Sequence, residues 1–145
     1  MEIYTIGFTK KNAAQFFQSL KRAGIKRLID VRLNNSSQLA AFTKKADLEY
    51  FLREICGAEY VHLPILAPTQ VMLDDYKKHN GSWNVYEERF LSLMNERQIE
   101  SKIEKTLFGV PSVLLCSEPT AEHCHRRLVL KYLKEKWPEI EAKHL

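Results

Sequence analysis

The segment from Cys116 to Arg127 concentrates the side chains of this chain that can do chemistry. Two thiols, two carboxylates, two imidazoles and two guanidinium groups lie within these twelve residues: Cys116, Glu118, Glu122, His123, Cys124, His125, Arg126 and Arg127. The segment follows an apolar run that begins at Val113, and it precedes apolar residues at helical spacing that begin at Leu128. In an open α/β sheet, ligands bind outside the carboxyl ends of the strands. The sequence therefore predicts a binding site at this strand-to-helix crossing.

Cys116 and Cys124 are candidate nucleophiles in that site. Cys124 lies near the expected start of a helix, where the helix dipole and the unpaired backbone amides lower the pKa of a thiol. His125 is a candidate base and Arg126 a candidate positive charge beside either thiol. Glu118 lies two residues beyond Cys116, on the same face of an extended chain, and is a candidate acid or base. The alternative for Cys116 is a buried, inert thiol that completes a strand.

The same segment also contains donor atoms that suit zinc, at Glu118, His123, Cys124 and His125. Their spacing does not match a closed structural zinc site, and side chains at adjacent helical positions point in different directions. The loop contains no glycine, which disfavours a phosphate cradle of the Walker or dinucleotide-binding type. We therefore predict no metal and no other cofactor.

Asp30 and Arg32 form a second candidate group, at the end of the strand expected over residues 27–32. Side chains two residues apart share a face of a strand, and a charge at the end of a buried strand is costly unless it is paired or used. Asp30 is a candidate acid or base that also orients Arg32, and Arg32 is expected to hold an anion together with Arg126. Ser36 follows in a polar loop that can reach the rim of a pocket. The alternatives are a structural ion pair and a plain surface turn.

Strands and helices are predicted to alternate along the chain. The expected strands are 3–6, 27–32, 60–63 and 113–116, and the expected helices are 12–23, one capped by Asp47 and ended by Gly57, 69–79, 84–107 and 120–137. This order predicts a compact three-layer α/β domain, with a mostly parallel sheet flanked by helices. The carboxyl ends of such strands meet at one edge, which brings Gly7, Asp30 and Cys116 together.

Composition agrees with an ordinary globular protein. The 145 residues are 45% hydrophobic and 28% charged, which fits one domain over residues 1–145. The net charge of +4 is mildly basic and does not by itself indicate nucleic acid. No apolar run is long enough to span a bilayer and no signal peptide is recognisable, so a cytoplasmic location without membrane partners is expected. Three cysteines are an odd count, which argues against a disulfide framework.

Four aromatic residues gather around the junction of two expected helices: Tyr76, Trp83, Tyr86 and Phe90. Aromatic side chains at helical spacing are more often part of a core than a platform on which a base stacks. We therefore predict that they are core residues.

The motifs of the chain resemble those of the DUF488 domain family, a family of unknown function. The resemblance rests on Thr5-Ile-Gly7, on Leu28-Ile-Asp-Val-Arg32, and on Leu115-Cys-x-Glu118 followed by Cys124-His-Arg126. It implies a compact α/β domain whose three motifs converge on one cleft, which adds Thr5 and Gly7 to the expected ligand-binding residues. The family often has His-Ser after the first motif, where this chain has Phe8 and Thr9. A mechanism that needs that imidazole is therefore in doubt.

Three functions remain open at this point. The first is an enzyme that acts on a small anionic or nucleotide-like ligand in the cleft. The second is a non-catalytic domain that binds a ligand or partner, in which the motif residues form a structural polar network. The third, ranked last, is a nucleic-acid-associated module that uses the basic face of the last helix; Arg127, Lys131 and Lys134 are better explained as a solvated face. The sequence does not decide the oligomeric state.

Overall fold

A single parallel sheet organises the chain. The computed structural model describes residues 1–35, 41–118 and 121–145. Five strands lie in the order β3-β2-β4-β1-β5, and all of their pairings are parallel. They are β1 (Glu2–Gly7), β2 (Arg27–Asp30), β3 (Glu59–His62), β4 (Ser112–Cys116) and β5 (Glu141–His144).

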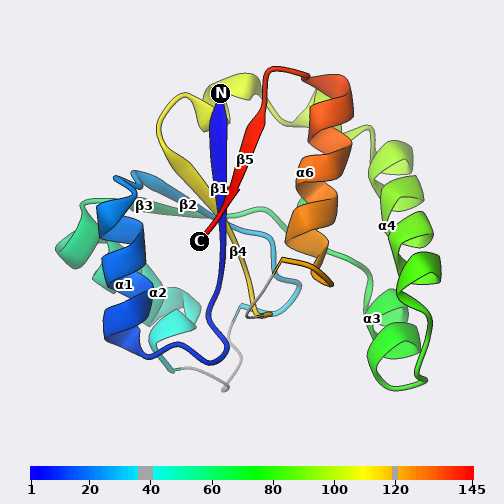
Figure 1. The fold of residues 1–145 in the computed structure, drawn as a ribbon, viewed down its shortest axis with the longest axis horizontal. Coiled ribbons are helices and arrows are strands. Elements are labelled where there is room, and N and C mark those ends of the chain that lie inside the picture. The colour runs from blue at the N-terminus through cyan, green and yellow to red at the C-terminus, as the bar shows by residue number, and fades with distance from the viewer. Residues whose placement is uncertain (36–40, 119–120) are drawn as a thin grey trace.

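Helices cover both faces of this sheet (Figure 1). One face carries α1 (Ala13–Arg22) and α2 (Lys45–Phe51), which continues as a π-helical turn, Leu52–Cys56. The other face carries α3 (Gln70–Lys77), α4 (Trp83–Arg97) and α6 (His125–Lys136). A separate buried cluster of apolar side chains lies on each side of the sheet. The predicted three-layer α/β architecture is confirmed.

Local signals explain most helix ends. Asn12 and Gln15 form a reciprocal capping box at the start of α1, and Gly24 follows the helix with a φ of 70°. Thr69 accepts a hydrogen bond from the amide of Met72 at the start of α3. Gly57 ends the π-helical turn in the left-handed conformation. Within the part of the chain that the structure describes, no helix combines the length and hydropathy that crossing a bilayer requires.

Several predicted boundaries are wrong. The helix expected over 84–107 is capped by Ser82 rather than Asn84, and it ends at Arg97 because Gln98 turns into the left-handed region at φ 52°. Two short pieces follow, α5 (Ile99–Lys102) and a 3-10 turn (Lys105–Phe108). The last helix begins at His125, not at residue 120.

The strand predicted over 27–32 ends at Asp30, so Arg32 lies beyond it. Two further corrections concern a surface residue and a surface strand. Asp47 lies inside the first turn of α2, whose N-cap is Lys44, so its carboxylate faces the helix dipole without acting as a cap. Strand β5 was not predicted at all, because its four residues are exposed and show no apolar run.

Candidate functional site

The carboxyl ends of three neighbouring strands position the candidate site. In the register of the sheet, Gly7 of β1 lies opposite Cys116 of β4, and Asp30 of β2 lies opposite Leu115 of β4. Residues from three distant parts of the sequence therefore meet at one edge of the sheet, as the parallel topology requires.

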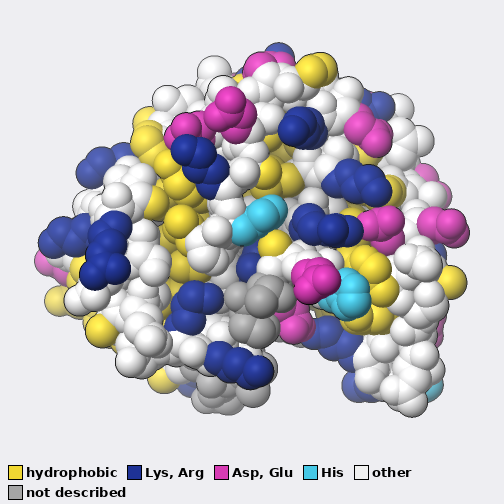
Figure 2. Space-filling view, in the orientation of Figure 1, with side chains coloured by type: hydrophobic (Ala, Val, Ile, Leu, Met, Phe, Trp, Pro, Cys, Tyr) yellow, Lys and Arg dark blue, Asp and Glu magenta, His cyan; other side chains and the backbone are white. Residues whose placement is uncertain are grey.

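A cavity of about 280 Å³ lies beyond this edge. Its wall is formed by the chain after β2, by α3 and the start of α4, and by the segment between β4 and α6. Charged side chains that line it include Arg32, Lys77 and Glu118. Figure 2 shows this side of the molecule hollowed at the bottom of the view, beside the lobe that α3 and α4 form.

Arg32 is held at the cavity by a buried ion pair with Asp30. The Asp30 carboxylate accepts hydrogen bonds from Nε of Arg32 at 2.9 Å, from Nη2 at 2.8 Å and from the backbone amide of Arg32 at 3.1 Å. The Tyr60 hydroxyl donates a fourth, at 2.6 Å. Nη2 of Arg32 also donates to the carbonyl of Thr43 at 2.7 Å. Asp30 is therefore engaged on both oxygens, and it does not line the cavity.

One side-chain nitrogen of Arg32 takes no part in this network. Nη1 is buried and has no hydrogen-bond partner among the described residues. The guanidinium carbon lies 5.4 Å from the centroid of Phe8, which itself lines the cavity. Burial, together with the Asp30 carboxylate, raises the pKa of the Tyr60 hydroxyl, so Tyr60 stays a donor to Asp30. The result is a preoriented guanidinium at the cavity wall.

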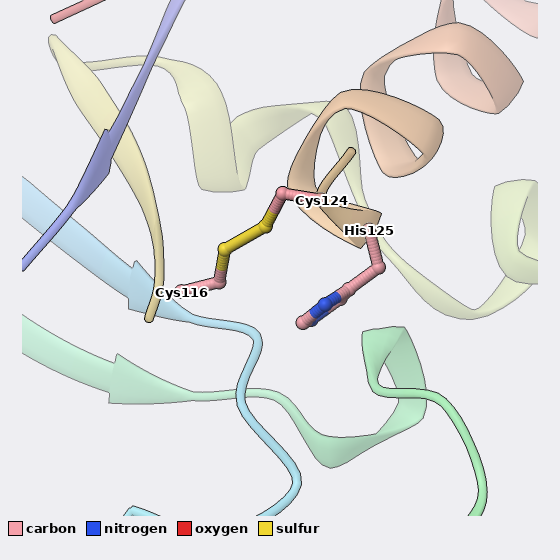
Figure 3. Close-up of side chains that lie close together, drawn as sticks. All are labelled: Cys116, Cys124 and His125. Atoms are coloured by element: carbon pink, nitrogen blue, oxygen red, sulfur yellow. A yellow bond between two sulfur atoms is a disulfide. The ribbon is translucent and has the colours of Figure 1, made fainter. Parts of the chain in front are cut away.

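The two motif cysteines are joined by a disulfide bond, Cys116 to Cys124 (Figure 3). The expectation from the odd cysteine count was therefore wrong for this pair, and only Cys56 is free. The bond joins the last residue of β4 to the N-cap residue of α6. In this state neither sulfur is a thiol nucleophile. Cys124 lines the cavity, whereas Cys116 lies behind it and is buried.

Arg126 was predicted to hold an anion together with Arg32, but its side chain is fully buried and does not line the cavity. Its Nη1 donates to the carbonyl of Glu118 at 2.7 Å and lies 3.6 Å from Sγ of Cys116. Nε and Nη2 have no hydrogen-bond partner in the described part of the chain. Burial lowers the pKa of Arg126 to about 10, with Glu118 acting in the opposite direction. A cation therefore lies next to the sulfur atoms.

His125 points toward the same centre but is already engaged (Figure 3). Its Nε2 lies 2.7 Å from the carbonyl oxygen of Val31, which can only accept, so Nε2 carries the proton. Burial lowers the pKa of His125 to about 4, although the Val31 carbonyl opposes this shift. His125 is therefore neutral near pH 7, which makes it a weak base for a nearby thiol.

Glu118, Thr5 and Ser36 complete the predicted set. Glu118 forms an ion pair of 2.6 Å with Lys77, and both side chains line the cavity. The Thr5 hydroxyl instead contacts Nδ1 of His144 in β5, and Thr5 does not line the cavity. Gly7 lies beneath Glu118 and Arg126. Ser36 lies outside the described residues. The structure therefore brings together the predicted residues of the second and third motifs, and separates Thr5 from them.

Aromatic side chains form a wall that sequence reasoning assigned to the core. Trp83 stacks on His123 with ring centroids 4.9 Å apart and on Tyr86 at 5.3 Å, while Tyr76 meets Trp83 at 5.6 Å. Tyr86 and Phe90 are indeed buried, but Tyr76 and Trp83 are only partly buried and line the cavity. Both also pack against the core cluster, so the prediction holds for Tyr86 and Phe90 and only in part for Tyr76 and Trp83. Their position at a helix junction after the third strand was the signal that pointed to the cavity.

We expect the purified protein to contain no tightly bound zinc. Donor atoms of Cys116, Cys124 and His125 lie within 4.8 Å of one another, which is close enough to share an ion. However, both sulfurs are bonded to each other, and the guanidinium of Arg126 opposes a second cation at this place. Elemental analysis should find far less than one zinc per chain. One zinc per chain that disappears in Cys124→Ser would contradict this expectation.

Comparison with known proteins gives a family. The family model described as "Domain of unknown function DUF488" matches residues 12–133. No curated protein and no solved structure matches the chain. The match spans most of the chain and includes the second and third motifs that form the cavity edge, and it confirms the resemblance that those motifs indicated. The chain belongs to the DUF488 family.

Proposed function

We propose that the cavity binds a small anionic ligand with a planar ring, of the nucleotide type, and that the protein is an enzyme that acts on it. The observation that carries this proposal is the pairing of two unlike walls in one cavity. Tyr76, Trp83 and His123 line it with aromatic rings. Arg32 lines it with a guanidinium, one nitrogen of which has no hydrogen-bond partner among the described residues. Rings stack on such faces, and guanidinium groups bind phosphate and carboxylate oxygens.

Different residues of the cavity serve ligand binding and the chemical step. Arg32 binds the anion in an orientation that Asp30 fixes, since Asp30 holds two other nitrogens of the same side chain. Among the described residues, two carboxylates line the cavity, those of Asp74 and Glu118, and Asp74 is held by Gln70 and Lys78 of its own helix region. Glu118 therefore serves as the acid or base when Lys77 exchanges onto the ligand. Phe8, in place of the imidazole that relatives often have, leaves this role to Glu118.

Binding can be tested with adenosine monophosphate as the probe. Isothermal titration should show that adenosine monophosphate binds more tightly than adenosine, which lacks the anion, and more tightly than inorganic phosphate, which lacks the ring. Trp83→Ala should weaken binding by about 5- to 160-fold, because a stacked base is worth about 1–3 kcal/mol. Tyr50→Ala is the matched control, since Tyr50 is an exposed aromatic residue on α2, away from the cavity. Equal affinity of the Trp83 variant and the wild type for adenosine monophosphate would contradict the proposal.

A non-catalytic binding domain is the second candidate, and one observation favours it. Asp30 is fully engaged with Arg32 and Tyr60, so this motif carboxylate acts as a structural partner rather than a free acid or base. Incubation of the protein with a mixture of nucleotides, followed by mass spectrometry, separates the candidates. An enzyme depletes one component, and Glu118→Gln abolishes the depletion while it still binds; a non-catalytic domain depletes none.

The nucleic-acid module stays last for a structural reason. Arg127 and Lys131 of α6 both lie near the carboxylate of Glu87 in α4, at 3.2 Å and 3.6 Å. Part of the basic face of α6 is therefore already compensated within the protein. Binding to DNA or RNA depends on Lys and Arg side chains that are free to displace counterions from phosphates.

A further inference from the structure

A buried positive charge without a salt bridge among the described residues lies beside the two bonded sulfur atoms. The Arg126 guanidinium is fully buried, and its Nη1 lies 3.6 Å from Sγ of Cys116. No carboxylate among the described residues forms a salt bridge with it, and its Nε and Nη2 have no hydrogen-bond partner there. A buried charge without a partner is costly. A disulfide sulfur is neutral and does not offset this cost, whereas a thiolate at the same place does.

The two sulfurs also differ in their access to small molecules. Cys124 occupies the N-cap of α6, a helix of twelve residues, and lines the cavity. The positive end of a helix dipole stabilises a thiolate. Cys116 ends the central strand β4 and does not line the cavity, although both cysteines are almost fully buried, 1% exposed for Cys116 and 2% for Cys124. One sulfur therefore faces the space where a reactant would lie, and the other lies behind it within bonding distance.

The bond is not needed to hold these elements together. The two cysteines are only eight residues apart in sequence, so the bond closes a short loop and removes less entropy from the unfolded chain than a bond that closes a long one. β4 and α6 already contact each other through the large core cluster that includes Leu114, Leu128 and Val129. A role beyond structural cross-linking is thus open to the pair.

We propose that Cys116 and Cys124 form a redox-active pair that exchanges with small thiols and disulfides through the cavity. Cys124, at the N-terminus of α6, is the exchanging sulfur, and Arg126 is the counter-ion of the Cys116 thiolate beside it. This activity goes beyond the ligand binding proposed above and does not depend on it.

The pair is oxidised in two exchange steps. The Cys124 thiolate attacks one sulfur of a low-molecular-weight disulfide, RSSR, forms Cys124–S–S–R and releases RS⁻. Cys116 then loses its proton to solvent, and its thiolate attacks the sulfur of Cys124. The protein disulfide forms and a second RS⁻ leaves. The pair is oxidised by two electrons, and RSSR is reduced to two thiolates. The reverse sequence, with two thiols as the reductant, restores the dithiol.

Cys56 provides an internal reference for this chemistry. It belongs to the other core cluster, and its thiol donates weakly to the carbonyl of Phe17 at 3.7 Å. Burial raises the pKa of the Cys56 thiol, against smaller opposing effects of Lys21 and Lys26. It should therefore stay a protonated, slowly reacting thiol under conditions in which the pair reacts.

The first test equilibrates the folded chain with mixtures of reduced and oxidised glutathione. Rapid alkylation and mass spectrometry then count the free thiols. We expect one two-electron transition between a form with three free thiols and a form with Cys56 alone free, and equal circular dichroism spectra at both ends. A protein that keeps three thiols against excess glutathione disulfide, or that is reduced only after urea unfolds it, would overturn the proposal.

The second test assigns the two sulfurs with a matched pair of variants. In reduced Cys116→Ser, glutathione disulfide should form a stable mixed disulfide at Cys124. In reduced Cys124→Ser, modification of Cys116 should be slower by about tenfold or more, because Cys116 is shielded from the cavity. Faster reaction of Cys116 than of Cys124 contradicts the assignment.

The role of Arg126 has its own readout, the thiolate absorbance of the reduced protein as a function of pH. The first midpoint of the wild type should lie below the ordinary thiol value of about 8.5. Arg126→Met should raise it by about one unit or more, and Arg126→Lys should retain part of the effect. A wild-type midpoint at or above 8.5 defeats the counter-ion role even when neither variant folds.

Discussion

Asp30→Asn should reduce the free energy of unfolding by about 3–5 kcal/mol, the cost of removing one partner from a buried ion pair. The carboxylate is fully buried and accepts hydrogen bonds from Arg32 and Tyr60. An amide in its place keeps the shape, but it removes the negative charge and turns one acceptor into a donor that faces other donors. The Arg32 guanidinium would then remain buried without a counter-ion. Urea denaturation followed by circular dichroism measures the loss.

Two further variants show whether the loss comes from burial of the charge. Glu59→Gln removes the partner of Arg27 in an exposed pair between the same two strands, and should cost less than about 1 kcal/mol. Tyr60→Phe removes only one of the hydrogen bonds to Asp30 and should cost about 1 kcal/mol. If Asp30→Asn were no more harmful than Glu59→Gln, Asp30 would not be the anchor of this network, and a direct catalytic role would be favoured instead.

The parts of the fold that the sequence predicted well are those with an apolar pattern. β1, β2 and β4 are short runs that bury residues such as Ile6 and Leu114, whereas the residues of β3 are only partly buried or exposed. The alternation of these strands with helices leaves a parallel sheet as the natural arrangement. β5 has no such pattern, because it lies at the edge of the sheet and pairs with β1 alone. The break at Gln98 was equally hidden, since glutamine is an ordinary helix former whose left-handed conformation depends on tertiary packing.

The sequence predicted which strand ends meet at the candidate site, but not which of its side chains are buried. The rule that parallel strands end at one edge located Asp30 and Cys116 correctly relative to each other. Sequence does not reveal which of two adjacent arginines is buried: Arg126 is enclosed, whereas Arg127 reaches Glu87 at the surface. The disulfide was missed for the same reason, because the distance between two thiols depends on where a helix starts over a strand.

Gly7→Ala is the other substitution for which we expect a large effect, a loss of about 3 kcal/mol or more in the free energy of unfolding. A Cβ atom at this position would lie 1.5 Å from the carbonyl oxygen of Glu118 and 2.5 Å from Nη1 of Arg126. The nearer atom belongs to the backbone, so a rotamer change cannot relieve the overlap. β1 is also fixed on both sides, by β4 and β5, and cannot move away. The segment after β4 must therefore shift.

Gly24→Ala separates this overlap from the general cost of replacing a glycine. Gly24 has a φ of 70°, and a Cβ there would meet nothing within 4 Å, so its substitution costs only the strain of a left-handed alanine, about 1 kcal/mol. Equal stability of the two variants in urea denaturation would show that the segment after β4 yields freely. We expect a larger loss for Gly7→Ala, together with weaker binding of adenosine monophosphate and a changed thiolate midpoint. These results would show that Gly7 supports the site. The Glu118 carbonyl that packs against Gly7 is the one that accepts the hydrogen bond from Arg126 beside the sulfur atoms.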